Sequence, residues 1–371
     1  MERFRVGTEI RRTRVEGFEN RKRSAKVFSK IDETKMSTGK TYAAVMVIPT
    51  VGCSWALSAS GGCSMCGYIN DSTLDPETDP ELYFLAEWEK LQQDPLFDKV
   101  EAVKLYNSGS FLDPKEISVE SQKRIVSKIA ESPQIKELVI ECLPGILNAQ
   151  VEVLAELVKI FGGRPIYVGV GLESSNAYIL RSYVNKPFTY ENQFVKCVLN
   201  AEKVGAAVKP YVLLKPPFLT EQEAIDDAVQ SVLDSFAAGC KVVSLNPVCI
   251  HADTLVDQMF KRREYSPPWL WSVLEVLRKV HPHIPDGAAL LCEVMAGGLK
   301  RGPHNCGVCD KRVLQEIEYY NLRGKFSPVV DDLACDCRPR WRQVLTMEAL
   351  LAQQSSISGR DIDVSSTQPI H

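Results

Sequence analysis

The sequence contains no run of apolar residues that approaches the roughly 18 needed to cross a membrane. Its first residues, MERFRVGTEIRR, lack the apolar core of a secretory signal peptide, so we expect the protein to be cytoplasmic. Internal repeats and low-complexity tracts are also missing, which excludes a repeat architecture. What is left is an ordinary globular composition, 45% hydrophobic and 25% charged, over 371 residues, enough for one large domain or a large and a small one.

Cysteine is the exception to this ordinary composition, with 12 residues in the chain. The cytoplasm keeps thiols reduced, so we expect no disulfides. Seven of the 12 fall in two clusters, at residues 53–66 and 306–337, and clustered thiols indicate metal or iron–sulfur ligation. We interpret the other five, which lie in apolar contexts, as small core residues: Cys142, Cys197, Cys240, Cys249 and Cys292.

The net charge of −3 conceals an uneven distribution. Residues 1–40 carry a local charge of +6 and residues 300–342 carry +3, so the rest of the chain is acidic, at −12. Basic ends on an acidic body indicate a polyanion that docks at particular places. Solvated charged faces would give the same composition, and charge alone does not separate the two interpretations.

Apolar runs alternate along the chain with amphipathic stretches. The stretches at 121–131, 152–161 and 221–236 predict helices, and the last has an acidic first turn after Thr220. Strands that are apolar on both faces and separated by helices form parallel sheets. We therefore predict an α/β fold, a partial (β/α)6 TIM-like barrel, because six units are too few for a closed (β/α)8 barrel. The predicted strands are residues 43–49, 100–107, 136–142, 165–172, 208–214 and 241–247.

Polar or conformationally restricted residues follow every predicted strand. In a parallel barrel the carboxyl ends of the strands meet at one mouth, where the site lies. Six such ends therefore indicate one site. They are the loop with Cys53, Cys63 and Cys66, then Asn107–Ser110, Glu141, Glu173–Ser175, Lys215–Pro217 and Asn246–Pro247.

The loop after the first predicted strand contains three cysteines in the spacing C-x9-C-x2-C, and no fourth cysteine lies nearby. Its sequence at residues 50–70 is TVGCSWALSASGGCSMCGYIN. Three thiolates can hold a [4Fe–4S] cluster and leave one iron open to a chelating molecule, such as the amino and carboxylate groups of S-adenosylmethionine (SAM). An electron passed into the SAM sulfonium would release a 5′-deoxyadenosyl radical, while the protein orients the reactants. A zinc site completed by a distant fourth ligand is the alternative.

These residues resemble the radical SAM superfamily over roughly residues 41–300. The long first gap between cysteines is similar to that of the elongator-catalytic-subunit-like branch, which modifies tRNA, although Met65 stands where an aromatic residue is usual. The resemblance implies that Cys53, Cys63 and Cys66 are the catalytic cluster ligands. It also implies SAM contacts from the turn residues Ser108, Gly109 and Ser110 and from Glu141, Glu173 and Ser174.

Three further segments, KPYVLLKPPFLTEQEAIDD, REYSPPWLWSVLEVL and KRGPHNCGVCDKR, are similar to the archaeosine-synthase radical SAM subunit (RaSEA) family. This resemblance implies a tRNA substrate whose D-loop carries a lysine adduct of 7-cyano-7-deazaguanine, made by a lysine-transferring partner subunit. It implies cleavage of a C–N bond in the lysine portion, which leaves archaeosine. A reductant protein would supply the electron.

Such a substrate presents an α-carboxylate and an α-amine that must be held while a radical forms on the lysine chain. Lys186 and Lys215 are candidates to pair with the carboxylate, and Glu173 or Asn246 with the amine. Lys215 is the better candidate for the carboxylate because it ends a buried strand and is followed by two prolines.

The second cysteine cluster lies after the predicted barrel and consists of two short pairs, Cys306-x2-Cys309 and Cys335-x-Cys337. Four thiolates suit tetrahedral Zn²⁺, which can staple a small domain that has little core of its own. An auxiliary [4Fe–4S] cluster would use the same four ligands, and unliganded thiols are the third possibility. We expect structural zinc.

Next to this cluster, Arg338, Arg340 and Arg342 are interleaved with Trp341, a pattern typical of phosphate contact combined with base stacking. Packing of Trp341 within the metal module is the alternative. Further phosphate contacts are expected from the N-terminal residues Arg11, Arg12, Arg14, Arg21, Lys22 and Arg23.

The sequence therefore predicts four parts: a basic N-terminal extension (1–40), a radical SAM partial barrel (41–300), a Cys-rich metal-binding and RNA-contacting module (301–353) and a polar tail (354–371). The leading hypothesis is a radical SAM enzyme that modifies tRNA. The alternatives are a radical SAM enzyme acting on a small molecule or peptide, and a non-catalytic zinc-bearing tRNA-binding protein.

Overall fold

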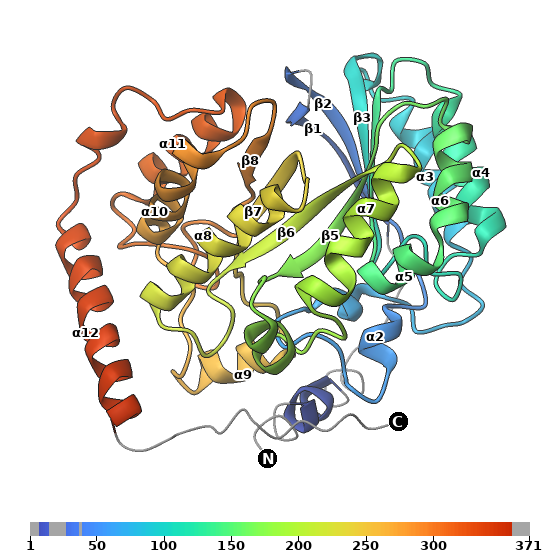
Figure 1. Ribbon diagram of the computed structural model, residues 1–371. Helices are drawn as coiled ribbons and strands as arrows, with labels where there is room; N and C mark the ends of the chain where they lie inside the picture. Colours follow the sequence, from blue (N-terminus) through green and yellow to red (C-terminus); the bar gives the residue numbers. More distant parts are fainter. Residues whose placement is uncertain (1–6, 15–26, 37–38, 358–371) are drawn as a thin grey trace.

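The computed structural model describes residues 7–14, 27–36 and 39–357 of the chain. Eight strands form one curved sheet whose spatial order follows the chain order (Figure 1). The first two strands pair antiparallel, and every later neighbouring pair is parallel. The strands are β1 (Phe28–Met36), β2 (Gly39–Val47), β3 (Val100–Tyr106), β4 (Glu137–Glu141), β5 (Ile166–Glu173), β6 (Ala207–Leu214), β7 (Val242–Pro247) and β8 (Ala289–Cys292).

The six predicted strands correspond to β2 through β7, so the predicted α/β partial barrel is confirmed. The sheet has two more strands than predicted, because β1 and β8 extend it at its two edges. β8 has only four residues, too few for a pattern of alternation, and β1 has the charged sequence FSKIDETKM, typical of an edge strand. Residues 28–36, predicted to belong to a basic extension, are therefore part of the sheet.

Helices follow the strands and cover the outer face of the sheet (Figure 1). The helix α8 (Glu221–Ala237) shows how the sequence directs this: Thr220 and Glu223 form a capping box at its start. Its buried residues recur at helical spacing and include Ile225 and Val232, and the helix packs on β6 and β7. The other helices are α2 (Ser54–Leu57), α3 (Pro80–Leu91), α4 (Val119–Ala130), α5 (Pro144–Ala149), α6 (Val151–Ile160), α7 (Val195–Lys203), α9 (Leu255–Lys261), α10 (Leu270–Val280), α11 (Asp310–Arg323) and α12 (Cys337–Ile357).

The hydrophobic core lies between the sheet and these helices. Trp88 of α3 is fully buried, stacked on Phe84 with ring centroids 5.6 Å apart and edge-on to Phe97 at 5.4 Å. Because the outer face of the sheet takes up the apolar side chains, the inner face is free to carry polar ones. Lys104 of β3 and Lys209 of β6 are examples, and both interact with Glu293.

The last two helices lie against the flank of the barrel. α11 packs on α10, and α12 packs on α8 (Figure 1).

In the part of the chain that the structure describes, no helix combines the length and the apolar character needed to span a membrane.

Candidate functional site

The loop after β2 carries the three cysteines predicted to hold a cluster. It includes α2 and lies at the mouth end of the sheet, close to α9 and to the helix of residues 7–14, drawn in dark blue in Figure 1. Burial raises the pKa of the Cys53 thiol to about 11 and that of the Cys63 thiol to about 12, and charge on Cys66 contributes to both shifts. All three cysteines lie on this one loop, within residues 53–66.

Two segments from distant parts of the chain hold this loop in place. Asn185 donates from its side chain to the carbonyl of Gly62 (2.7 Å), and its own carbonyl accepts the indole N–H of Trp55 (2.8 Å). The backbone of Asn185 is left-handed, with φ 65°, which Asn tolerates better than most residues. After β7, the side chain of His251 accepts the backbone N–H of Gly67 at 3.2 Å.

A third contact comes from Arg14, which nothing in the sequence distinguishes from its neighbouring arginines. Its side chain is buried, and its guanidinium donates to the carbonyls of Gly61 (3.2 Å), Cys63 (3.3 Å) and Cys66 (3.0 Å). A guanidinium presents several donors in a fixed plane, so one side chain can fasten three carbonyls at once. Arg14 therefore fastens the cysteine loop, and the predicted phosphate contact at this position is corrected.

The turn predicted to contact SAM, Asn107–Ser110, is shaped by Glu116, which the sequence analysis missed. Oε1 of Glu116 accepts the N–H of Ser110 (3.0 Å), and Oε2 accepts the side-chain amide of Asn107 (2.9 Å). Gly109 lies so close over this carboxylate that a Cβ there would be 2.1 Å from it, which explains the glycine. Burial raises the pKa of Glu116 to about 8.

The same turn is tied to the cysteine loop. The Oγ atoms of Ser108 and Thr50 are 3.3 Å apart. Ser54, next to the first cysteine, donates its hydroxyl to Asp113 (2.5 Å) and its backbone N–H to Glu116 (3.4 Å). The structure thus brings together the predicted cluster ligands and the predicted SAM turn.

Inside the barrel, polar side chains from β3, β4 and β6 lie near Glu293, which directly follows β8. Glu141, predicted to contact SAM, accepts a hydrogen bond from Tyr211, and burial raises the pKa of Glu141 to about 7. Lys209 pairs with Glu293 at 3.3 Å. The pKa of Glu293 is lowered, chiefly by Lys209 and further by Lys104, against the effect of burial. The sequence analysis missed these lysines because single lysines within apolar strands resemble residues at the surface.

Glu173, at the end of β5, forms a buried ion pair with Lys186 at 2.9 Å. Gly171 provides the space, since a Cβ at that position would be 2.4 Å from the Glu173 carboxylate. Burial opposes the charge on Lys186, but Cys63 and Glu173 outweigh it and raise the pKa of Lys186. The pair therefore lies beside the cysteine loop. Ser174 is buried as well, and its hydroxyl donates to Asp227 of α8 at 2.7 Å.

Lys215, at the end of β6, is also neutralised by a buried partner. Its Nζ lies 2.7 Å from the carboxylate of Glu221, which also accepts the N–H of Trp269 (2.8 Å) and the hydroxyl of Ser272 (2.6 Å). Asn246 differs, because among the described residues no donor reaches its buried Oδ1. A buried acceptor without a donor costs free energy.

The four cysteines of the second cluster converge as the sequence predicts. All four sulfurs lie within 4.8 Å of one another, with Cys306 and Cys335 3.5 Å apart and Cys309 and Cys337 3.6 Å apart. The indole N–H of Trp271 donates to the Cys337 sulfur at 3.2 Å, as an outer-shell donor to a thiolate ligand would.

Some of the residues predicted to contact RNA are buried or partly buried, and others are exposed. Trp341 is buried, and its indole N–H donates to Ser272 at 2.8 Å, so it packs the module instead of stacking on a base. Arg338 lies over the Trp271 ring at 5.2 Å and is partly buried. Arg340 and Arg342 are exposed, as are Arg11 and Arg12, whereas Arg21, Lys22 and Arg23 lie outside the described residues.

No family model matches the sequence. The chain is similar to the archaeosine synthase subunit beta of Methanosarcina acetivorans, with 32% identity over 312 residues, which cover 83% of this chain and 86% of that one. The subunit beta of Thermococcus kodakarensis is also 32% identical, over 315 residues that cover 83% of this chain and 93% of that one.

Among solved structures, a queuine lyase from Clostridium spiroforme bound to SAM and queuine has 17% identity and a TM-score of 0.43, covering 65% of this chain and 90% of that one. The N-terminally truncated Elp3 of Methanocaldococcus infernus has 17% identity and a TM-score of 0.46, with coverage of 66% and 60%.

The Lys215–Glu221 pair gives a test of stability. Glu221→Gln should lower the free energy of unfolding by about 3–5 kcal/mol, because it leaves the buried Lys215 ammonium without a counter-charge. Urea denaturation measures the loss. Glu223→Gln is the matched control, since Gln also serves at this capping position and Glu223 is not buried. Equal losses in the two variants would contradict a special role for the buried pair.

The Arg14 contact gives a second test. After anaerobic reconstitution, Arg14→Gln should lower the iron content and shorten the life of the bound cluster under chelator by roughly tenfold, because the variant cannot make the three charge-assisted hydrogen bonds to the loop. The decay of visible absorption measures this lifetime. Arg12→Gln, an exposed neighbour paired with Glu9, should match the wild type. If the Arg14 variant held its cluster as long as this control, the contact would have no role in holding the loop.

Proposed function

Because the chain belongs to the archaeosine synthase subunit beta family, we propose that it is a radical SAM enzyme that completes archaeosine in tRNA. Its substrate would be a tRNA whose D-loop carries a lysine adduct of 7-cyano-7-deazaguanine. The observation that carries the proposal is that three thiols lie on one loop, which Arg14 fastens at the strand ends of a parallel partial barrel. A lysine-transferring subunit and a one-electron reductant protein are the proposed partners, and the cytoplasm is the proposed location.

The residues at the mouth fit a [4Fe–4S] cluster and SAM. Cys53, Cys63 and Cys66 would hold the cluster, and three thiols without a fourth leave one iron for SAM. When bound, cluster and SAM would supply a 5′-deoxyadenosyl radical that takes one hydrogen atom from the lysine chain, with one electron and one SAM used for each radical. The turn with Ser108, Gly109 and Ser110 would bind SAM from one side, and Glu141, Glu173 and Ser174 from the others.

The lysine end of the substrate carries both charges of an amino acid. Its amine would be held by Glu173 or by the Asn246 side-chain oxygen, which is buried and has no donor within the described structure. Its carboxylate would pair with Lys186 or Lys215. Both lysines already have a carboxylate partner, so the substrate would share the lysine with that partner or displace it. The radical would thereby form on a chain fixed at its far end.

For the second cluster we propose structural Zn²⁺. Zinc–sulfur bonds of about 2.3 Å in a tetrahedron set the sulfurs about 3.8 Å apart. The two sulfur pairs at 3.5 and 3.6 Å match that spacing. A [4Fe–4S] cluster would place iron and sulfide between the thiolates and spread them further.

The proposed reaction can be tested with anaerobically reconstituted protein, SAM, dithionite and tRNA bearing the lysine adduct. We expect the adduct nucleoside to disappear and archaeosine to form, with one 5′-deoxyadenosine for each archaeosine, as measured by mass spectrometry of digested tRNA. Deuterium placed on the lysine side chain should appear in the 5′-deoxyadenosine. Formation of 5′-deoxyadenosine while the authentic adduct stays intact would sink the proposed substrate.

The cluster assignment has its own test. Alanine at any one of Cys53, Cys63 and Cys66 should abolish SAM cleavage while the barrel still folds, because the loop lies outside the hydrophobic core. Cys249→Ala, which removes a thiol outside both clusters, is the control. Activity within tenfold of wild type in any of the three loop variants would contradict the assignment.

The zinc site is tested by metal analysis. Cys306→Ala or Cys335→Ala should release about one zinc per chain and destabilise the module, with iron retained, because structural zinc contributes roughly 10–16 kcal/mol in small finger peptides. A loss of about four iron atoms, with zinc absent from the wild type, would identify an auxiliary cluster instead.

A further inference from the structure

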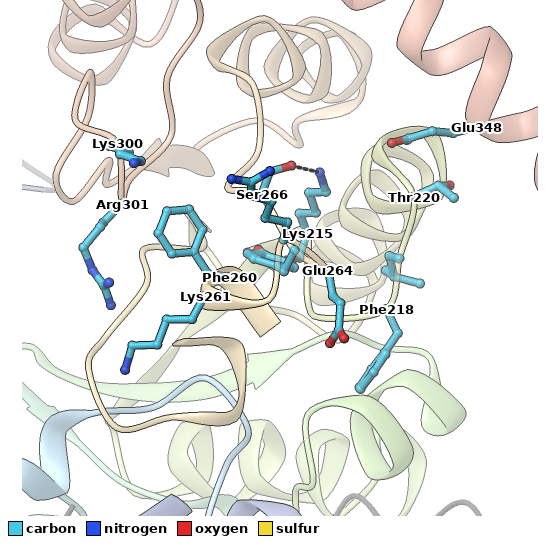
Figure 2. A pocket seen from close by; sticks show the side chains of 13 residues that line it. Lys215, Phe218, Thr220, Phe260, Lys261, Glu264, Ser266, Lys300, Arg301 and Glu348 are labelled. Atoms are coloured by element: carbon cyan, nitrogen blue, oxygen red, sulfur yellow. Dashed lines mark hydrogen bonds between the residues drawn. The ribbon is translucent and has the colours of Figure 1, made fainter. Parts of the chain in front are cut away.

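A groove opens beside the barrel mouth, and no predicted RNA contact lies in it (Figure 2). Its volume is about 660 Å³. Residues that follow three neighbouring strands form its walls. Lys215 and Phe218 follow β6, and Lys300 and Arg301 follow β8. Lys261 is the last residue of α9, the helix after β7, and Arg263 comes two residues later. The groove therefore borders the strand ends on which the proposed active site is built.

The groove is rich in positive charge. In Figure 2 the side chains of Lys261, Lys300 and Arg301 lie on one side of it, with Phe218 on the other. Lys261 and Arg301 share a single carboxylate, that of Asp257, at 2.8 and 2.7 Å. Within the described residues, no carboxylate pairs with the exposed side chains of Arg263 and Lys300. Opposite them lies Glu348, which has no cationic partner among the described residues. The net charge of the groove is therefore positive.

A row of aromatic rings begins at the same edge. The ring of Phe218 is 5.2 Å from that of Tyr183, which is 5.3 Å from that of Tyr178. The two end members are large and exposed, Phe218 at 45% and Tyr178 at 51%. Aromatic faces beside a basic groove are what unpaired bases stack on when a protein binds a single-stranded or looped nucleic acid.

The backbone of the groove is also unusual. Lys215, Phe218 and Arg263 have left-handed φ values of 67°, 71° and 63°, which L-residues adopt at a cost. Strain of this kind tends to be kept at functional sites, where it aims particular side chains. Here all three residues line the same groove.

We propose that this groove binds the RNA backbone, with the row of Tyr178, Tyr183 and Phe218 as the platform on which unpaired bases stack. The cations would contact phosphates, and the groove would bring the modified nucleotide to the mouth beside it. This proposal rests on the proposed function for the identity of the polyanion. It moves RNA docking away from the C-terminal module, where Trp341 is buried.

The test is a titration of tRNA transcript into the full-length protein at several salt concentrations. The double variant Arg263→Gln/Lys300→Gln should bind more weakly and lower the slope of log K against log salt by roughly 1.4–1.8, because two phosphates are no longer neutralised by the protein. Phe218→Leu and Tyr178→Leu should weaken binding by roughly 5- to 150-fold for each stacked base and leave the slope unchanged. Thermal unfolding confirms that each variant folds.

Two control sets separate the outcomes. Lys159→Gln/Lys203→Gln removes two exposed cations near the C-terminal ends of α6 and α7, away from the groove, and should leave the slope as in wild type. Arg340→Gln/Arg342→Gln tests the C-terminal face. A flatter slope in that set, with the groove variants at wild-type values, would overturn the groove and leave the proposed function intact. Absence of tRNA binding by the wild type at any salt concentration would overturn both.

Discussion

The buried carboxylate of Glu221 joins the end of β6 to the start of α10. It pairs with Lys215 after β6, and it accepts hydrogen bonds from the backbone N–H of Trp269 and the hydroxyl of Ser272 in α10. Ser272 in turn accepts the indole N–H of Trp341, so α10 contacts the cysteine module here as well as through Trp271 and Cys337. A charge buried this deeply is tolerated only when every partner is present. That requirement fixes how β6, α8, α10 and α12 come together.

The same requirement governs the mouth of the barrel. Each buried lysine there has a carboxylate: Lys186 has Glu173, Lys215 has Glu221, and Lys209 has Glu293. Glu173 and Lys215 both adopt left-handed backbone conformations as their strands end, which turns their side chains away from the strand direction. A mouth built in this way carries little uncompensated charge. The amino-acid ends of the proposed ligands, SAM and a lysine adduct, each carry one charge of either sign, so either would be bound without leaving an ion unpaired.

The sequence was sufficient for those features that depend on local pattern. Continuous apolar runs located six strands of the sheet, because strands buried on both faces admit few polar residues. Cysteine spacing located the four-thiol site, since short pairs bring their sulfurs together on tight loops. The resemblance to the archaeosine synthase subunit is confirmed by relatives that align over 83% of the chain.

The functional residues that the sequence did not reveal make contacts that no local pattern marks. Arg14 meets the cysteine loop about 50 residues away, and nothing local separates it from Arg12 on the same helix. Glu116 shapes a turn that is nearer in sequence, but a carboxylate that accepts backbone N–H groups looks in sequence like any surface glutamate. Trp341 shows the opposite error, because arginine interleaved with an aromatic has the same pattern whether the ring is buried or exposed.

The segment after β7 connects the groove to the cysteine loop. His251 accepts a hydrogen bond from Gly67 of the loop, and Val256, at the start of α9, donates its N–H to the carbonyl of Ser64 at 3.4 Å. One residue later, Asp257 holds Lys261 and Arg301 in the groove wall. α9 has only seven residues and makes both sets of contacts, so it links the groove wall to the cysteine loop. A polyanion that draws Lys261 and Arg301 away from Asp257 therefore acts on the same short helix that supports the cysteine loop.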